Sequence, residues 1–311
     1  MIRFVSPVQG TIMSPPSTPF ALSLSKPVLS ACKAVEGGCP LFWAQRRKNG
    51  ASTSSARTGR GSANAVLTAL ALAFSFPATA QAADGQTPQP AIAVDNYPYQ
   101  LFLPRGYNAD SKVNWPLLIF LHGSGERGDD VAKVKVHGPP KIADRSPDFP
   151  FVTVSPLLGA DQDWDVAKLD RLLDHVTKTL RIDPTRIYLT GLSRGGHASW
   201  RWAAVEPHRF AAVAPVAGRG ETATACALKD TPIWAFHGDR DDVVVPEGSF
   251  DMARAIRACG GRLSRLTIYP DLGHNSWDPA YDDPALYLWL LSHRLPTPPD
   301  AATNKKTKER K

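Results

Sequence analysis

Short apolar segments alternate with longer amphipathic segments over residues 98–295. The run LLIFL at 117–121 is continuously apolar, as in a strand buried on both faces. The predicted strands are 99–103, 117–121, 151–155, 186–190, 211–216, 232–237 and 263–269. Apolar residues recur at helical spacing in four longer segments, which predict helices at 164–180, 195–205, 249–259 and 284–295. The pattern indicates an α/β fold, with a mostly parallel sheet covered by helices on both faces.

Two polar residues are candidate N-caps of these helices. Asp163 precedes the helix at 164–180, and Ser249 starts the helix at 249–259. Side-chain oxygens of Asp and Ser accept hydrogen bonds from the free N–H groups of a first helical turn. The longest connection between elements, 217–231, has about 15 residues, which argues against a large lid domain.

An apolar, uncharged segment, ANAVLTALALAFSF, occupies residues 63–76. Arg57 and Arg60 lie upstream of it, and the small-residue run ATAQAA lies downstream. This order predicts a signal peptide at 63–82, cut after Ala82. An uncleaved membrane anchor is the alternative, but the run falls short of the roughly 20 residues that span a bilayer.

The rest of the chain is expected to comprise an extension, one domain and a tail. Residues 1–62 are rich in Ser, Pro, Thr and Gly, and are interpreted as a disordered extension or a start-site artefact. Residues 83–295 form the predicted mature domain, which export would place in the periplasm or outside the cell. Residues 296–311 are rich in Pro and Thr and then basic, and are expected to be disordered.

The formal net charge of +7 comes from the two ends of the chain. Residues 1–82 hold eight bases and one acid, and the last seven residues hold five bases and one acid. Residues 83–304 hold 23 bases and 27 acids. A domain that binds nucleic acid normally has a basic surface of its own. Nucleic acid is therefore not an expected partner.

The segment GLSRG at 191–195 fits the pattern G-x-S-x-G and lies between a predicted strand and a predicted helix. In this context the serine stands on a sharp turn that exposes its hydroxyl, and small residues are needed on both sides. Gly191 and Gly195 provide them. Ser193 is therefore the candidate nucleophile, with the N-terminus of the next helix available to stabilise negative charge.

A serine nucleophile needs a base, and the base needs an acid to orient it. Where the nucleophile stands on such a turn, the acid and then the histidine follow it in the sequence. His274 is the candidate base because its loop, DLGHNSW, comes directly after a predicted strand. The acid is expected in HGDRDD, where Asp241 is preferred and Asp239 and Asp242 are alternatives.

The tetrahedral intermediate of acyl transfer needs N–H donors for its oxyanion. Arg194, directly after the nucleophile, is expected to supply one donor from its backbone. The Gly-rich turn in LHGSGERG is expected to supply another, from Ser124 or, as second choice, Gly125. The turn lacks the sequence features of a phosphate-binding loop. His122 and His237 are expected to have structural roles.

Aromatic and charged residues near these segments are candidates for a substrate pocket. Trp277 lies three residues after His274 and is expected either to bind an acyl or aryl group or to belong to the core. Glu126 and Arg127 are expected to meet a polar substrate or to pair with each other, and Trp200 is expected in the core. The sequence has no H-E-x-x-H and no cysteine spacing suited to zinc, so neither a metal nor a cofactor is expected.

The predicted domain contains two cysteines, Cys226 and Cys259. Export would place them in an oxidising compartment, where an even number of cysteines suggests a disulfide. One lies before the strand at 232–237 and the other at the end of the helix after it, so adjacent elements would bring them together. Two separate buried thiols are the alternative.

Six segments occur in a characteristic order over about residues 98–295: LHGSGERG, HGPPK, FVTVSP, GLSRGG, WAFHGDRDD and GHNSWDPAY. In this combination the chain resembles the α/β-hydrolase superfamily, and within it the secreted dienelactone-hydrolase and prolyl-oligopeptidase-like esterases of the "predicted peptidase" type. The resemblance implies an α/β-hydrolase fold and a Ser–Asp–His triad, which falls on Ser193, Asp241 and His274.

The activity that the resemblance implies is the hydrolysis of a small-molecule or polymer-borne carboxylic ester by a secreted serine esterase. A serine peptidase of the prolyl-oligopeptidase-like type is an alternative, but it would have to hold its substrate and protonate a poorer leaving group. A non-catalytic secreted binding protein is a remote alternative, because it would have no use for all three triad residues. The sequence leaves the acyl group and the number of subunits open.

Overall fold

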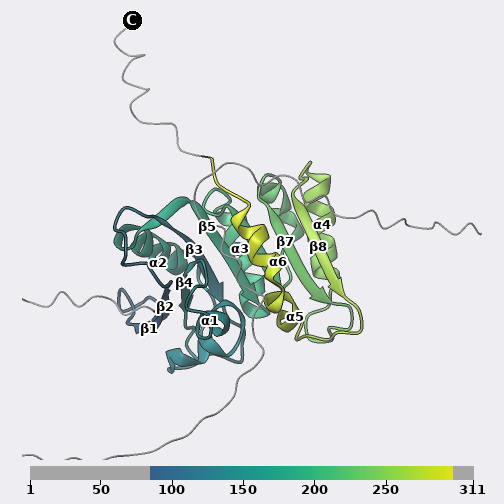
Figure 1. Ribbon diagram of the computed structural model, residues 1–311. Helices are drawn as coiled ribbons and strands as arrows, with labels where there is room; N and C mark the ends of the chain where they lie inside the picture. Colours follow the sequence, from purple (N-terminus) through teal and green to yellow (C-terminus); the bar gives the residue numbers. More distant parts are fainter. Residues whose placement is uncertain (1–84, 297–311) are drawn as a thin grey trace, which may run out of the picture. The chain divides into compact units, whose positions relative to one another are not determined.

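The computed structural model describes residues 85–296 (Figure 1). The predicted N-terminal extension, the predicted signal peptide and the tail from residue 297 lie outside the described residues. Between residues 85 and 296, no helix has both the length and the apolar character needed to cross a membrane.

The described part of the chain is built on one eight-stranded sheet with the order β1-β2-β4-β3-β5-β6-β7-β8. Strands β3 to β8 run parallel to one another, whereas β2 pairs antiparallel with β4 and β1 pairs antiparallel with β2 at one edge. The strands are β1 Gly85–Gln89, β2 Tyr99–Leu103, β3 Trp115–Leu121, β4 Val152–Pro156, β5 Ile182–Leu192, β6 Ala212–Val216, β7 Ile233–Gly238 and β8 Ser264–Tyr269.

Helices cover both faces of the sheet (Figure 1). One face carries α2 Val166–Thr179, α3 Arg194–Val205 and α4 Glu247–Ala258. The other carries α1 Gly138–Ala143, α5 Trp277–Asp282 and α6 Pro284–Leu291. Two short 3-10 helices, η1 Val131–Val136 and η2 Thr222–Leu228, lie in the connections. This is the three-layer arrangement that the alternation of strands and helices predicts.

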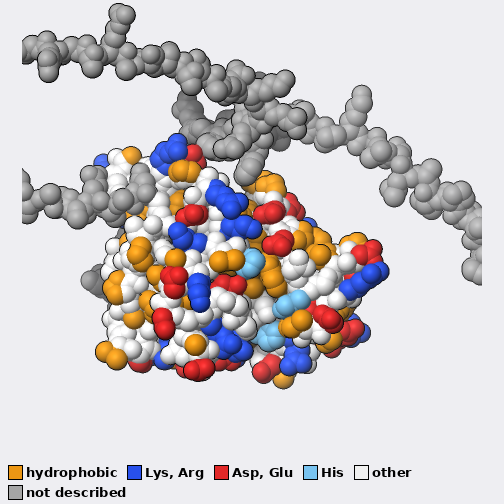
Figure 2. Space-filling model, turned by 90° about the horizontal axis from the view of Figure 1, so that it is seen from below, with side chains coloured by type: hydrophobic (Ala, Val, Ile, Leu, Met, Phe, Trp, Pro, Cys, Tyr) orange, Lys and Arg blue, Asp and Glu red, His pale blue; other side chains and the backbone are white. Residues whose placement is uncertain are grey.

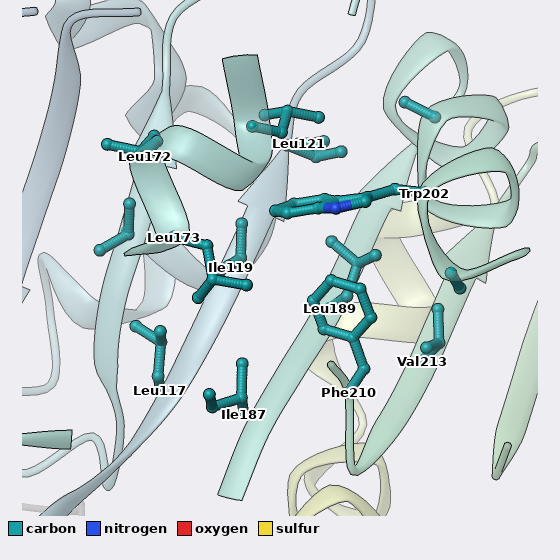
Figure 3. Close-up of a cluster of buried hydrophobic side chains, with 14 of the residues drawn as sticks. Leu117, Ile119, Leu121, Leu172, Leu173, Ile187, Leu189, Trp202, Phe210 and Val213 are labelled. Carbon is teal, nitrogen blue, oxygen red and sulfur yellow. The ribbon is translucent and has the colours of Figure 1, made fainter. Parts of the chain in front are cut away.

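Each strand contributes to two hydrophobic cores because successive side chains point to opposite faces of a sheet. In β3, Leu117, Ile119 and Leu121 point to the face covered by α2 and α3. Trp202 of α3 and Phe210, which follows α3, belong to the same buried cluster (Figure 3). The intervening side chains of β3 point to the other face, towards α1, α5 and α6. Burial of each such large side chain contributes about 1.5–3 kcal/mol, so the central strands are held firmly and the loops at their ends have a rigid base.

All seven predicted strands and all four predicted helices occur in the structure, with differences at their ends. Strand β5 is longer than predicted, and α6 stops at Leu291. Both predicted N-caps are wrong: Asp165, not Asp163, accepts the capping hydrogen bond of α2, and α4 begins at Glu247, so that Ser249 lies inside it. Strand β1 and helices α1 and α5 were not predicted, because five or six residues are too few to show a period.

Cys226 and Cys259 form a disulfide. Cys226 belongs to η2, and Cys259 follows the last residue of α4. The bond therefore ties the connection between β6 and β7 to the helix that follows β7. It closes a loop with a sequence separation of 33 residues.

Reduction of this disulfide is expected to lower the free energy of unfolding by about 3–4 kcal/mol, because the unfolded chain regains the entropy of the open loop. Urea unfolding with and without dithiothreitol measures the difference. The double variant Cys226→Ser/Cys259→Ser is the control and should be insensitive to the reductant. Equal midpoints for the oxidised and reduced wild-type protein would contradict the prediction.

Candidate active site

The candidate catalytic residues gather where three parallel strands end. Ser193 follows β5, Asp241 lies in the loop after β7, and His274 lies in the loop after β8. The carboxyl ends of parallel strands meet at one edge of a sheet, which is where ligands bind in open α/β folds. Figure 2 views this edge, and histidine side chains lie close together on it among acidic and basic ones.

Ser193 has a backbone conformation that side-chain-bearing residues rarely adopt, with φ 51° and ψ −115°. The chain reverses here from β5 into α3, and the glycines of the motif make the turn possible. A Cβ on Gly195 would lie 1.9 Å from the carbonyl oxygen of Leu121, and a Cβ on Gly191 would lie 2.5 Å from that of Gly195. The sharp turn therefore needs glycine on both sides of the serine, as the motif predicts.

Ser193, His274 and Asp241 form one hydrogen-bonded chain. The Oγ of Ser193 is 2.9 Å from Nε2 of His274, and Nδ1 of His274 is 2.7 Å from Oδ2 of Asp241. Since a carboxylate only accepts hydrogen bonds, Nδ1 carries the imidazole proton and Nε2 is left to accept from the serine hydroxyl. The candidate nucleophile thus faces the candidate base, and a carboxylate orients that base.

Asp241 is the aspartate of its loop that reaches His274. It is 3% exposed, whereas Asp239 and Asp242 are exposed to solvent. Burial opposes ionisation of Asp241, but hydrogen bonds from His274 and from the backbone N–H groups of Val243 and Val244 outweigh it. The pKa of Asp241 therefore lies below its usual value, and the residue is a carboxylate at neutral pH.

His237 supports the same carboxylate from behind. It is fully buried, and its Nε2 lies 3.1 Å from Oδ2 of Asp241 and 2.7 Å from the carbonyl oxygen of Val244. Both partners are acceptors, so Nε2 carries a proton and donates to them. Nδ1 of His237 lies 2.8 Å from the hydroxyl of Ser249. The structural role expected for His237 is thus a specific one: it helps to hold Asp241.

Two loops lie beside the nucleophile and carry the expected oxyanion donors. Ser124 follows β3, and Arg194 is the first residue of α3, where backbone N–H groups have no acceptor within the helix. The side chain of Arg194 connects the two, because its Nε donates to Oγ of Ser124 at 3.0 Å. Arg194 therefore holds the turn of Ser124 next to its own backbone N–H, so the two expected donors belong to connected segments.

A cleft of about 290 Å³ opens beside Ser193. The residues that line it come from the loops after β3, β4 and β7 and from α3: Ser124, Asp163, Ser193, Arg194, His197, Arg201, Val243 and Val244. Sequence reasoning did not find Arg201, Val243 or Val244 as cleft residues. The available signal was the spacing of Arg194, His197 and Arg201, which lie three and four residues apart on one helix and therefore share a face.

The three residues proposed from the sequence for a substrate pocket do not line this cleft. Glu126 is 8% exposed and accepts a hydrogen bond from the backbone N–H of Gly123, so it holds the turn from inside. Arg127 donates to the carbonyl of Ser124 instead of pairing with Glu126. Trp277 packs edge-on against the imidazole of His274, with ring centroids 5.1 Å apart.

Trp200 is fully buried in the core, as the sequence indicated. No group of three or more His, Cys, Asp or Glu side chains within residues 85–296 has the arrangement of a metal site.

Comparison with known proteins finds relatives among the esterases. A bifunctional acetylxylan esterase/xylanase of Neocallimastix patriciarum is 29% identical over 168 residues, which are 51% of this chain and 24% of that protein. A protein named probable feruloyl esterase C, from Aspergillus terreus, is 26% identical over 221 residues, which are 67% of this chain and 80% of that protein. No family model matches the chain.

Two solved structures show the same architecture. A thermostable esterase shares 26% sequence identity with a TM-score of 0.58, over 67% of this chain and 63% of that chain. A ferulic acid esterase shares 17% identity with a TM-score of 0.52, over 66% of this chain and 95% of that chain, and this likeness bears on the fold alone. The chain therefore spans about a quarter of its first curated relative and somewhat less than two thirds of the thermostable esterase.

The strand order, the serine turn between β5 and α3 and these structural matches define the class of the protein. The chain has the α/β-hydrolase fold. The resemblance seen in the sequence segments is thereby confirmed, and esterases are among the relatives of the chain.

His122 holds the start of the turn after β3, which carries Ser124. It is fully buried; its Nε2 accepts from the backbone N–H of Leu158 at 2.9 Å, and its Nδ1 donates to the carbonyl of Gly123 at 2.7 Å. Burial lowers the pKa of His122 to about 4. In the folded protein it is therefore a neutral hydrogen-bonding group, which is the structural role expected from the sequence.

The free energy of unfolding is expected to fall as the pH drops from about 7 to about 4.5, and His122 contributes about 2 kcal/mol of that loss. The unfolded chain takes up a proton on this histidine below its usual pKa of 6.5, whereas the folded protein does so only near 4. Urea unfolding at both pH values, on the wild type and on His122→Gln, isolates this contribution. An equal pH-dependent loss in both proteins would contradict the assignment.

Proposed function

We propose that the protein is a serine esterase that cleaves carboxylic esters through an acyl-enzyme on Ser193. The observation that carries the proposal is the continuous hydrogen-bonded chain from Ser193 through His274 to Asp241, at 2.9 and 2.7 Å. It stands at the carboxyl edge of the sheet and opens into a cleft. A nucleophile, a base and an orienting acid in this order are the requirements of acyl transfer.

The proposed reaction has two steps. His274 takes the proton of Ser193 as its hydroxyl oxygen attacks the ester carbonyl, and Asp241 stabilises the imidazolium that forms. Backbone N–H groups of Arg194 and Ser124 donate hydrogen bonds to the developing oxyanion and stabilise its charge. His274 then protonates the leaving alcohol, and water repeats the sequence to release the acid and regenerate Ser193.

The relatives support an ester substrate. Their names refer to acetylxylan and feruloyl esters, which carry a small acyl group and an aromatic one on a carbohydrate. The cleft is open and lies in loops of a single domain, which suits short-chain esters and esters on a bulky polymer. We therefore include p-nitrophenyl esters of several lengths and methyl ferulate among the test substrates.

Residues 83–311 are expected to hydrolyse p-nitrophenyl acetate, butyrate and octanoate, and the variant Ser193→Ala is expected to lose at least about 10³-fold in kcat, because the nucleophile acts as one unit with its base. Release of p-nitrophenolate measures the rate, and the trend with chain length measures the acyl pocket. His208→Ala, at an exposed position in the turn after α3, is the control and should retain the wild-type rate.

Equal background rates for the wild type and Ser193→Ala would refute the esterase proposal. The same two proteins would then be assayed on peptide p-nitroanilides. Hydrolysis of these by the wild type alone would identify a peptidase. If neither protein hydrolysed them, the non-catalytic binding protein would be the remaining interpretation.

We also propose that the protein is exported, with a signal peptide at 63–82 that is removed. The disulfide between Cys226 and Cys259 supports this proposal, because such bonds persist in oxidising compartments.

Expression of the full chain in a bacterium with a general secretory pathway is expected to give a periplasmic or extracellular product that begins at Ala83. Mass spectrometry of the N-terminal peptide measures the cleavage point. The variant Ala80→Leu/Ala82→Leu replaces the small residues that the signal peptidase needs, and should block cleavage. Cytoplasmic accumulation of the uncut wild-type chain would contradict the proposal.

A further inference from the structure

The cleft beside Ser193 is lined by two chemically different sets of residues. Helix α3 contributes Arg194, His197 and Arg201 to its lining, and the loop after β7 contributes Val243 and Val244. Burial, together with the positive charges of Arg219 and Arg194, lowers the pKa of His197, which is therefore neutral at pH 7. The positive charge of the α3 residues thus comes from the two arginines.

The two arginines differ in how their charge is compensated. Arg194 pairs with Asp163, with Nη1 3.2 Å from Oδ1, and also donates to Ser124. Arg201 donates from Nη2 to the backbone carbonyl of Trp164, and within residues 85–296 no carboxylate forms an ion pair with it. A carbonyl oxygen satisfies one N–H group but does not neutralise the charge. The guanidinium of Arg201, which is exposed to solvent, therefore brings a positive charge without a direct ion-pair partner to the cleft.

Asp163 is the acidic side chain among the residues that line this cleft, and it already forms an ion pair with Arg194. Burial opposes its ionisation, but the N–H of Trp164, the guanidinium of Arg194 and the charge of Arg201 outweigh burial and hold the pKa of Asp163 below its usual value. With Arg194 and Asp163 cancelling, the cleft keeps one net positive charge. It does so in a domain whose residues 83–304 hold more acids than bases, 27 against 23.

The position of Arg201 sets the distance between the ester group and the second group of a substrate that Arg201 would bind. Arg201 is eight residues beyond Ser193, so their Cα atoms are about 12 Å apart along the helix at about 1.5 Å per residue. Side chains on a helix lean back toward its N-terminus, which is the end of α3 that follows Ser193. The apolar side chains of Val243 and Val244 line the same cleft.

The geometry points to Arg201 as an anion-binding subsite, so that the preferred substrates are esters that also carry a carboxylate several bonds from the ester carbonyl. The inference rests on the proposed esterase activity and narrows its substrate class. Arginine suits this role because its planar guanidinium presents N–H groups that match a carboxylate, and such charge-assisted bonds are stronger than neutral ones. The carboxylate belongs either to the acyl part or to the alcohol part of the ester.

Two pairs of substrates show whether the carboxylate belongs to the acyl part or to the alcohol part of the ester. In the acyl pair, mono-p-nitrophenyl suberate carries the carboxylate and its methyl-capped form does not. In the alcohol pair, p-acetoxyphenylacetate carries it and p-acetoxyphenylacetamide does not. For one pair or both, the wild type is expected to show kcat/KM about tenfold higher for the anionic member, as a charge-assisted hydrogen bond would give. That ratio should shrink as salt screens the charge.

The ratio of anionic to neutral kcat/KM is the decisive measurement on variants. It is expected to fall to about one in Arg201→Gln and to lie between the two values in Arg201→Lys, which keeps the charge but not the planar fork. Arg254→Gln, at an exposed arginine of α4 that pairs with Asp251, removes the same charge elsewhere and should keep the wild-type ratio. A wild-type ratio near one for both pairs, or an undiminished ratio in Arg201→Gln, would overturn the inference.

A binding measurement separates failure of this inference from failure of the esterase proposal. Ser193→Ala is titrated calorimetrically with monomethyl suberate and with the corresponding neutral amide, and the double variant Ser193→Ala/Arg201→Gln is titrated in the same way. About tenfold tighter binding of the anion, lost in the double variant, supports the subsite even if no ester is hydrolysed. Equal binding of the two compounds, or no binding of either, counts against it.

Discussion

The site depends on how closely backbone segments approach one another at the carboxyl ends of the parallel strands. Gly195 lies so near the end of β3 that a Cβ would be 1.9 Å from the carbonyl oxygen of Leu121. Gly238, at the end of β7, lies so near the His274 loop that a Cβ would be 2.1 Å from the carbonyl oxygen of Leu272. These contacts fix the serine turn and bring the acid and base loops together, so the triad distances follow from backbone packing that side chains larger than hydrogen would prevent.

The two hydrophobic cores provide the rigidity that this close packing needs. The central strands alternate their side chains between the α2–α3–α4 face and the α1–α5–α6 face, and both sets are buried. Ser193, with φ 51°, has a strained backbone conformation, which persists only where the surrounding structure holds it. Here the strand before the serine and the helix after it are both anchored in those cores, so the strain at Ser193 is compensated by burial elsewhere.

Buried histidines form the supporting layer of the site. His122 holds the turn that carries Ser124, and His237 holds the loop that carries Asp241. His122 joins two backbone groups, and His237 joins a carboxylate, a hydroxyl and a backbone carbonyl. Buried polar groups without such partners are costly. The cleft lies in front of this layer, and its chemistry differs from that of the support: an arginine-bearing helix face and two valines line it. The proposed catalytic residues thus lie in the loops after β5, β7 and β8, and the proposed anion subsite lies on α3.

The sequence by itself determined seven of the strands, the four longer helices, the serine turn and the histidine loop, because periodicity and short motifs are local properties of a chain. It missed β1, α1 and α5, which are too short to show a period. It left the aspartate open among Asp239, Asp241 and Asp242, because the choice depends on which carboxylate is buried beside His274. It left Trp277 open between a substrate pocket and the core, and Glu126 between a polar substrate and Arg127; in the structure Trp277 packs on His274 and Glu126 braces a turn. Only the tertiary structure decided the cleft, since its walls come from four segments far apart in the sequence, and their juxtaposition is set by packing across the sheet.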